Sequence, residues 1–464
     1  MADIWRMGAA DLAAAIRSKQ VTSTEVVEAH LARIAAVNPK LNAVTVVFAE
    51  EALAAAKSAD AKVASGAPLP ALHGVPMTVK ENIDLTGSAT TQGLVAMAQA
   101  VPPADAPHVA QMKAAGAIPI GRTNLPDFGL RWHTDNELRG PTRNPWDASR
   151  TPGGSSGGEA AALATGMTPL GLGNDLGGSL RWPSQCCGTA AIKPTFGRVP
   201  WMSQLPPADS PLTLQLWAVQ GPMARHVRDL RVALRCMAAP DARDPWYMPV
   251  PLEGPAVPRR VAVTYDPAGE GVDTRVAAGV RRAADALRDA GYEVVDAEPP
   301  AVAAGRDIWG QVLMAEAKAA LLPVLGPLFG KDARDFLETA IEAVPQLDLA
   351  GYVGAFAARQ GLARAWSLFF QQYPLVLGPV ATIQPFTVGF DLGAAGVRAM
   401  LTAQRLVVIP NLLGLPTAVV PVGLDAGLSQ GVQIIGDRYR EDLCLDAAQA
   451  IEERLGVVTP IDPR

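Results

Sequence analysis

The stretch TPGGSSGGEAAALATGMTPLGLGNDLGGS, residues 151–179, decides how this chain is interpreted. It contains Ser155 and Ser179, each set among glycines. Glycine loses more backbone entropy on folding than any other residue, so such runs suit places where the backbone takes unusual dihedrals or approaches another group closely. A site where backbone N–H groups bind an oxyanion is one such place.

Composition indicates a globular α/β protein. The 464 residues are 49% hydrophobic and 18% charged, and glycine and proline are abundant, as in a loop-rich α/β fold. The net charge of −5 supplies no basic footprint for nucleic acid. The four cysteines are too few and too scattered for a disulfide framework.

The ends and the apolar runs of the sequence bear on where the protein works. The start, MADIWRMG, lacks a basic segment followed by an apolar core, which a secretory signal needs. No apolar run reaches the roughly 20 residues that span a bilayer. We therefore expect a cytoplasmic protein with no membrane partner.

Apolar periodicity predicts alternating strands and helices. Residues 9–65 are expected to be helical, with Asn38-Pro39 ending one helix. Val75, Met77 and Val79 alternate with Pro76, Thr78 and Lys80, which predicts a strand with Lys80 at its exit. The remaining expected strands are residues 117–124, 169–175, 259–266, 292–295, 407–423 and 431–436. The remaining expected helices are residues 108–116, 158–166, 273–290, most of 300–372, and 441–456.

Three familiar hydrolytic or phosphate-binding arrangements do not fit. The text GGSSG, residues 153–157, matches the nucleophile elbow of α/β-hydrolases, but that fold needs an acidic residue and then a histidine downstream, and only His226 follows. The five histidines form no metal-ligand pattern, and no glycine run ends in Gly-Lys-Ser or Gly-Lys-Thr. A serine nucleophile without a histidine base remains.

Four elements of the sequence resemble the amidase signature family of serine hydrolases, and the likeness covers nearly the whole chain. These are GVPMTVKENID with Lys80, PGGSSGGEAAALATG with Ser155, GLGNDLGGSLRWP with Ser179, and GLPTAVVPVG with GVQIIG near the C-terminus. The resemblance implies an α/β fold in which a central, mostly parallel or mixed β-sheet lies between helices. It implies a single amidase domain, residues 1–464, with a signature core at 65–238, a variable substrate-shaping segment at 240–400 and a C-terminal sheet and helix at 405–458.

The same resemblance assigns roles to residues. Ser179 is expected to be the nucleophile, Ser155 a bridging serine after a cis peptide bond, and Lys80 the base. A lysine buried beside hydroxyls has a lowered pKa, so its neutral amine can accept a proton. The implied oxyanion hole consists of the backbone N–H groups of Leu176, Gly177, Gly178 and Ser179. Supporting contacts are expected from Asp175, Arg181 and Ser156, and pocket walls from Gly129, Leu130 and Trp132.

Three departures from the family pattern bear on substrate. Arg131-Trp132-His133 stands where many members have small residues, so we expect a narrowed or flattened pocket. Trp132 could equally pack against the body of the protein. Asn174 stands where Thr or Ser is common. Pro200-Trp201-Met202-Ser203 replaces the Ser-Arg-Tyr-Gly typical of the transamidosome subunit, which argues against a tRNA-dependent role.

The resemblance implies hydrolysis of the C–N bond of a neutral amide: a primary amide, an anilide or another aryl or alkyl amide. Carbamate (urethane) and ester bonds are further candidates for the same chemistry. The alternative is a glutaminase-type amidotransferase subunit that works in a complex. The expected partners are a small-molecule amide or carbamate and a second copy in a homodimer, with no nucleic acid, metal or cofactor.

Overall fold

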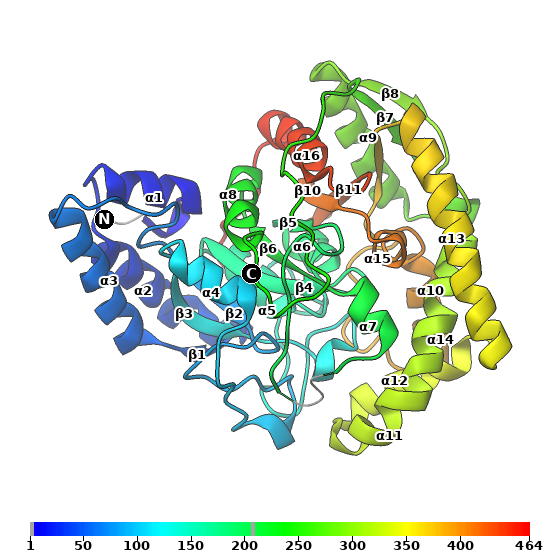
Figure 1. Cartoon of the computed structure of the whole chain (residues 1–464), viewed down its shortest axis with the longest axis horizontal. Helices are drawn as coiled ribbons and strands as arrows, with labels where there is room; N and C mark the ends of the chain where they lie inside the picture. The colour runs from blue at the N-terminus through cyan, green and yellow to red at the C-terminus, as the bar shows by residue number, and fades with distance from the viewer. Residues whose placement is uncertain (1–3, 206–208) are drawn as a thin grey trace.

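The computed structural model describes residues 4–205 and 209–464. An eleven-stranded sheet runs through the described part of the chain (Figure 1). In spatial order its strands are β1 (Val44–Val47), β3 (Ile118–Thr123), β2 (Pro76–Lys80), β4 (Leu170–Asp175), β6 (Val219–Ala224), β5 (Ala190–Lys193), β10 (Thr417–Asp425), β11 (Leu428–Gly436), β9 (Leu375–Pro379), β7 (Arg260–Val263) and β8 (Glu293–Asp296).

The sheet is mixed, as expected, but parallel pairing is the minority. Among the described strands, six of the ten pairings are antiparallel, and they form the central block from β4 to β9 together with the β1–β3 edge. The strands expected at 259–266 and 292–295 form a βαβ unit with the helix expected between them, because β7 and β8 are parallel and are joined by α9 (Thr274–Asp289). Parallel pairing thus lies toward the two ends of the sheet.

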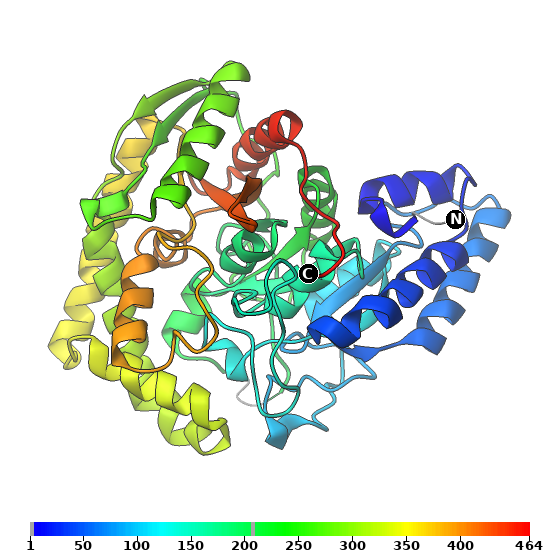
Figure 2. The same cartoon turned by 180° about the vertical axis from the view of Figure 1, so that it is seen from behind.

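Helices cover both faces of the sheet, which confirms the α/β/α architecture (Figures 1 and 2). One apolar cluster joins one face of the strands to α9 and five other α-helices. Those five are α1 (Ala9–Arg17), α2 (Ser23–Leu41), α4 (Pro107–Ala114), α8 (Val227–Met237) and α16 (Glu441–Leu455). A second cluster joins the other face to a larger set of helices. That set includes α5 (Gly157–Ala164), α6 (Arg181–Cys187), α7 (Leu212–Trp217), α10 (Val302–Glu316), α12 (Lys331–Ala343), α13 (Leu349–Gln372), α14 (Ala394–Ala403) and α15 (Ile409–Leu413).

Three local expectations were wrong. The segment 9–65 is interrupted by strand β1, which pairs with β3 and lies between α2 (Ser23–Leu41) and α3 (Ala49–Ala64). Helix α2 continues through Pro39 to Leu41, because Asn42 in the left-handed conformation ends it instead.

The third wrong expectation concerns residues 407–423, of which only the second part is a strand. Ile409–Leu413 forms the short helix α15, with Pro410 in its first turn and Gly414 at φ +71° after its last. Proline pre-sets the helical φ at such a position and glycine tolerates the left-handed cap, so these two residues override the β preference of Val and Ile.

One helical run is unusually apolar. Residues 302–328, which comprise α10, a π-helical turn, α11 (Leu322–Leu325) and a 3-10 turn, have a mean hydropathy of 1.3 and carry few charges, so they are long and apolar enough to cross a membrane. No uninterrupted apolar run of this length is visible in the sequence. A single helix of this kind is weak evidence of a span, and part of it lines the cavities beside Ser179.

Candidate active site

Lys80 is the last residue of β2 and is completely buried. Because side chains alternate along a strand, Met77 and Val79 pack into the cluster on one face, while Thr78 and Lys80 point to the other. The Lys80 Nζ lies 2.7 Å from the Ser155 Oγ and 2.7 Å from the Asn174 Oδ1. The strand therefore delivers one amine to two side chains from distant parts of the chain.

The surroundings of Lys80 set its protonation. Burial lowers the pKa of Lys80 to about 7, although the carboxylates of Asp175 and Glu159 favour the charged form. A substantial fraction of the amine is then neutral near pH 7, and a neutral amine has a lone pair that accepts a proton.

Ser155 lies in the loop before α5, after a cis peptide bond between Gly154 and Ser155. Close backbone approach explains its glycine neighbours. A Cβ on Gly153 would lie 2.5 Å from the Pro183 Cα, and a Cβ on Gly154 would lie 2.5 Å from the Arg131 carbonyl oxygen. Any side chain at either position would force this loop apart.

The two serine loops meet, and the larger of two cavities lies against both. Ser155 and Ser179 line that cavity, and the Ser156 N–H donates a hydrogen bond of 3.2 Å to the Ser179 carbonyl oxygen. The Ser156 Oγ itself is buried and has no hydrogen-bond partner among the described residues. Ser156 thus supports the site through its backbone.

The Asp175 carboxylate stabilises the turn between β4 and α6 through hydrogen bonds to its backbone. The Asp175 carboxylate accepts hydrogen bonds from the Gly178 N–H at 2.8 Å and the Leu180 N–H at 3.0 Å. Arg181 binds the same carboxylate with two nitrogens, at 2.9 and 3.0 Å. Burial alone would raise the pKa of Asp175, but the Arg181 charge and hydrogen bonds outweigh it and hold the pKa well below its usual range.

The backbone N–H groups of this turn differ in availability. The Gly178 N–H, expected among the oxyanion donors, donates to Asp175 and is hydrogen-bonded within the turn. Among the described residues, the N–H groups of Leu176, Gly177 and Ser179 have no acceptor. Three of the four expected donors are therefore free to bind an oxyanion.

Two tryptophans hold the carbonyl side of the same turn. The Trp309 Nε1 donates to the Leu176 carbonyl at 3.3 Å, and the Trp132 Nε1 donates to the Gly177 carbonyl at 3.0 Å. In a trans peptide the C=O and the following N–H point in opposite directions. The Trp309 contact therefore turns the Gly177 N–H away from that indole. A Cβ on Gly177 would lie 2.6 Å from the Trp309 ring, which explains the glycine.

Asn174 is oriented by a second asparagine. Its Nδ2 donates to the Asn82 Oδ1 at 2.9 Å, which leaves the Asn174 Oδ1 facing Lys80. An amide oxygen only accepts hydrogen bonds, so it engages an N–H of Lys80 and leaves the amine lone pair for Ser155. A threonine or serine hydroxyl at this position could donate to that lone pair. The sequence interpretation did not identify Asn82 as a site residue, although Asn82 lies only two positions after Lys80 in the sequence.

Two adjoining cavities open beside Ser179. The larger, of about 390 Å³, also contacts polar groups such as Asn82 and Gln220. The smaller, of about 110 Å³, is mainly apolar. The expected pocket residues Gly129, Leu130 and Trp132 line the smaller cavity, and Gly129 lines both.

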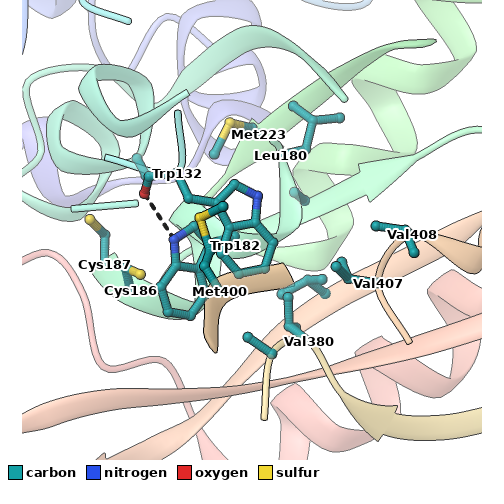
Figure 3. Packing of buried hydrophobic residues seen from close by; sticks show 14 of the residues in the cluster. Trp132, Leu180, Trp182, Cys186, Cys187, Met223, Val380, Met400, Val407 and Val408 are labelled. Carbon is teal, nitrogen blue, oxygen red and sulfur yellow. Dashed lines mark hydrogen bonds between the residues drawn. The ribbon is translucent and has the colours of Figure 1, made fainter. Parts of the chain in front are cut away.

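Trp132 satisfies both interpretations offered for it. Its ring stacks on Trp182 with centroids 4.9 Å apart, and its carbonyl accepts a hydrogen bond from the Trp182 Nε1 (Figure 3). The adjacent Cys186 and Cys187 are buried in the same cluster. Trp132 therefore packs on the body and also presents part of its surface to the smaller cavity.

The neighbours of Trp132 do not narrow the pocket as expected. Arg131 forms a two-pronged ion pair with Asp391, at 2.9 Å for each contact. His133 is buried against the Thr151 hydroxyl, 3.1 Å away, and burial lowers its pKa to about 4. Both side chains tie the loop to other segments, so the expectation was wrong for them, whereas Trp132 does line the smaller cavity.

The segment 240–400, expected to shape the substrate pocket, and the residues just after it contribute a wall whose individual residues the sequence interpretation did not identify. This wall of the smaller cavity comprises Trp309, Leu313, Met314, Glu316, Ala317, Leu321, Phe336, Leu337, Ala340, Met400, Leu401 and Gln404. No local motif marks them. Within residues 4–205 and 209–464, no cluster of three or more His, Cys, Asp or Glu side chains could hold a metal ion.

Comparison with known proteins finds relatives along nearly the whole chain. A family model described as Amidase matches residues 25–445. The chain is 46% identical to an indoleacetamide hydrolase of Bradyrhizobium diazoefficiens over 460 residues, which cover 98% of this chain and 88% of that protein. It is 35% identical to a glutamyl-tRNA(Gln) amidotransferase subunit of Anaeromyxobacter sp., over 98% of this chain and 97% of that one.

Solved structures show the same fold. A bacterial aryl acylamidase of the amidase signature family superposes with a TM-score of 0.83 at 28% identity, covering 96% of each chain. A peptide amidase from Stenotrophomonas maltophilia superposes with a TM-score of 0.80 at 26% identity, covering 99% of this chain and 98% of that one. With the family match over nearly its whole length, the chain belongs to the amidase signature family and is an enzyme that acts on amides.

Proposed function

We propose that the chain hydrolyses neutral amides with Ser179 as nucleophile, Ser155 as proton relay and Lys80 as base. The observation that supports this assignment is the 2.7 Å contact between the Lys80 Nζ and the Ser155 Oγ, made by a lysine whose pKa burial lowers to about 7. A base in hydrogen-bond reach of a hydroxyl, with a pKa near the operating pH, is what proton transfer requires.

The reaction follows in two halves. Neutral Lys80 takes the Ser155 proton while the Ser155 Oγ takes the proton of Ser179, whose Oγ attacks the carbonyl carbon. The free N–H groups of the 176–179 turn stabilise the resulting oxyanion. The C–N bond then breaks, the proton returns through Ser155 to the leaving nitrogen, and an acyl ester remains on Ser179. A water molecule activated by the same path hydrolyses that ester and restores the serine.

The substrate class we propose is the primary amide of an arylacetic acid. The resemblance to an indoleacetamide hydrolase and the apolar, aromatic lining of the smaller cavity both support it. The acyl group would occupy the smaller cavity, and the leaving ammonia would face the larger one. The same acyl transfer extends to aryl amides, carbamates and esters, since each offers a carbonyl carbon and a leaving group.

An amidotransferase subunit is the alternative that the relatives raise. Such a subunit draws ammonia from glutamine, whose carboxylate needs a cationic partner. The described lining of the two cavities includes no Lys, Arg or His side chain. This absence favours a neutral amide. Glutamine hydrolysis by the isolated chain, compared with hydrolysis of an arylacetamide, separates the two functions.

Matched serine variants test the proposed roles. With indole-3-acetamide as substrate and ammonia release as the readout, we expect Ser179→Ala to lose at least about 10⁴-fold in kcat and Ser155→Ala about 10²–10⁴-fold. Ser156→Ala is the control, because the Oγ that it removes has no partner among the described residues, and it should retain activity within about threefold. Substantial turnover by Ser179→Ala would contradict the proposal.

A further inference from the structure

Apart from Ser179, the described lining of the smaller cavity contains one polar side chain with a buried atom that lacks a hydrogen-bond partner. Of its other polar walls, Glu316 accepts hydrogen bonds from the Thr213 hydroxyl at 2.6 Å and the Tyr352 hydroxyl at 2.6 Å. The indole nitrogens of Trp132 and Trp309 donate hydrogen bonds to carbonyl oxygens of the 176–179 turn. Gln404 is only 4% exposed, yet among the described residues the Oε1 of its carboxamide is buried without a hydrogen-bond partner. Ser179 apart, Gln404 is the unsatisfied group of this pocket.

An unpaired carboxamide in an apolar pocket is costly. Leaving a buried polar group without a hydrogen bond costs about 1–3 kcal/mol, which a leucine or methionine of similar size would avoid. The cost is recovered when a ligand brings the missing partner. Because Gln404 lines a cavity that also reaches Ser179, the ligand that could do so is the acyl group of the substrate.

The backbone of Gln404 is fixed, whereas its carboxamide is adaptable. Its N–H donates to the Met400 carbonyl at 3.1 Å and its carbonyl accepts from the Val408 N–H at 3.2 Å, so the end of α14 is anchored. Rotation about the Cγ–Cδ bond exchanges the amide oxygen and nitrogen without changing the shape of the side chain. The pocket can therefore present an acceptor to a donor on the ligand.

The rest of the lining selects a compact aromatic group. Trp132, Trp309 and Phe336 supply aromatic walls. The cavity volume of about 110 Å³ is well below the roughly 300–1,000 Å³ of sites for drug-sized ligands, so it suits one ring system better than a long acyl chain.

We propose that the Gln404 carboxamide oxygen accepts a hydrogen bond from a ring N–H of the acyl group, and so selects nitrogen-bearing aromatic acetamides over hydrocarbon or sulfur analogues of the same shape. This inference rests on the proposed function, because it places the acyl group in the smaller cavity. Gln404 acts on binding and selectivity, and the bond-making steps belong to other residues.

A matched pair of substrates tests the inference. Indole-3-acetamide and 1-benzothiophene-3-acetamide have the same bicyclic shape, but only the first has a ring N–H. We expect wild-type protein to favour the indole in kcat/KM by about 10–100-fold, since a site built for a hydrogen bond rejects an analogue that leaves its polar group unpaired. Gln404→Met should lose that preference by slowing the indole substrate while leaving the benzothiophene substrate within about twofold.

The controls separate selectivity from damage to the fold. Gln449→Met, on α16 at the opposite face of the sheet, should retain the wild-type preference. Equal kcat/KM values for the two amides in wild-type protein would overturn the inference, and so would an equal loss on both substrates in Gln404→Met. Neither result touches the proposed amide hydrolysis.

A binding measurement decides the matter if neither amide is hydrolysed, an outcome that would refute the arylacetamide proposal itself. Calorimetry with indole-3-acetate and 1-benzothiophene-3-acetate then compares the rings without turnover. Tighter binding of the indole acid by wild-type protein, lost in Gln404→Met, supports the inference. Equal affinities overturn it.

Discussion

Two buried lysines of this enzyme have similarly lowered pKa values but different hydrogen-bond partners. Lys80 ends β2 and Lys193 ends β5, and both are completely buried. Burial lowers the pKa of each to about 7. Lys80 contacts the Ser155 hydroxyl and the Asn174 amide oxygen, whereas Lys193 donates to the Pro194 backbone carbonyl at 2.8 Å.

A lowered pKa is therefore not sufficient for catalysis. A carbonyl oxygen has no proton to give, so the neutral amine of Lys193 has nothing to deprotonate. The Lys80 amine faces a hydroxyl that in turn lies at a cavity with a second hydroxyl, Ser179. The atom that each amine contacts, and not its pKa, distinguishes the two lysines.

The largest expected effect is on turnover, in a matched pair of methionine variants. Lys80→Met should lose about 10³-fold or more in kcat/KM, because it removes the base, while Lys193→Met should stay within about threefold of wild type per folded molecule. Steady-state hydrolysis of indole-3-acetamide measures both. Comparable losses in the two variants would mean that Lys193 also serves the reaction, and the distinction drawn from their partner atoms would fail.

The sequence distinguishes these lysines only through the family resemblance. Each follows a short apolar run, and nothing local says which will meet a hydroxyl. The glycine runs around Ser155 and Ser179 did carry a local signal, because close backbone approach excludes a Cβ at Gly153 and Gly154. Most strands and helices could likewise be predicted from local periodicity.

The rest of the site depends on contacts between distant segments. Trp309 and Gln404 meet the 176–179 turn or its cavity only after the chain has folded. Trp309 lies in a segment that was simply expected to be helical, and Gln404, which follows α14, lies in no expected element. Arg131 was expected to narrow the pocket because the sequence does not reveal its ion-pair partner, Asp391, which lies 260 positions away. The bond from Gly178 to Asp175 likewise follows from turn geometry that the glycine pattern alone does not specify.

The second prediction concerns stability and its pH dependence in Lys193→Met. A neutral folded lysine with a pKa of about 7 binds fewer protons than its unfolded form, whose pKa is near 10.5, so wild-type stability should rise between these pH values. At pH 7 the burial penalty is nearly full. A shift of one pKa unit is worth about 1.4 kcal/mol, and the lost bond to Pro194 offsets part of the gain.

We therefore expect Lys193→Met to be more stable than wild type by about 2 kcal/mol at pH 7, or about 2 °C in Tm for a chain of this length, and to lose that advantage by pH 9.5. Thermal unfolding at the two pH values measures this difference. A gain that is the same at both, or a loss of stability at pH 7, would show that the Lys193 amine is not neutral in the folded protein.

The smallest expected effect sharpens the role of the Asn174 contact. In wild-type protein kcat/KM should rise with pH through an apparent pKa near 7, because only neutral Lys80 accepts a proton. Asn174→Asp places a carboxylate beside the Lys80 Nζ, which favours the ammonium form and should raise its pKa by about 1–3 units. Activity at pH 7 should then fall about tenfold and recover as the pH approaches 9.

Asn174→Thr is the neutral control. The apparent pKa of its kcat/KM profile should remain near 7, while its hydroxyl competes with Ser155 for the amine lone pair. If the apparent pKa of Asn174→Asp also stays near 7, the group that titrates in the kcat/KM profile is not Lys80. The difference between Lys80 and Lys193 would then rest on the geometry of their contacts alone.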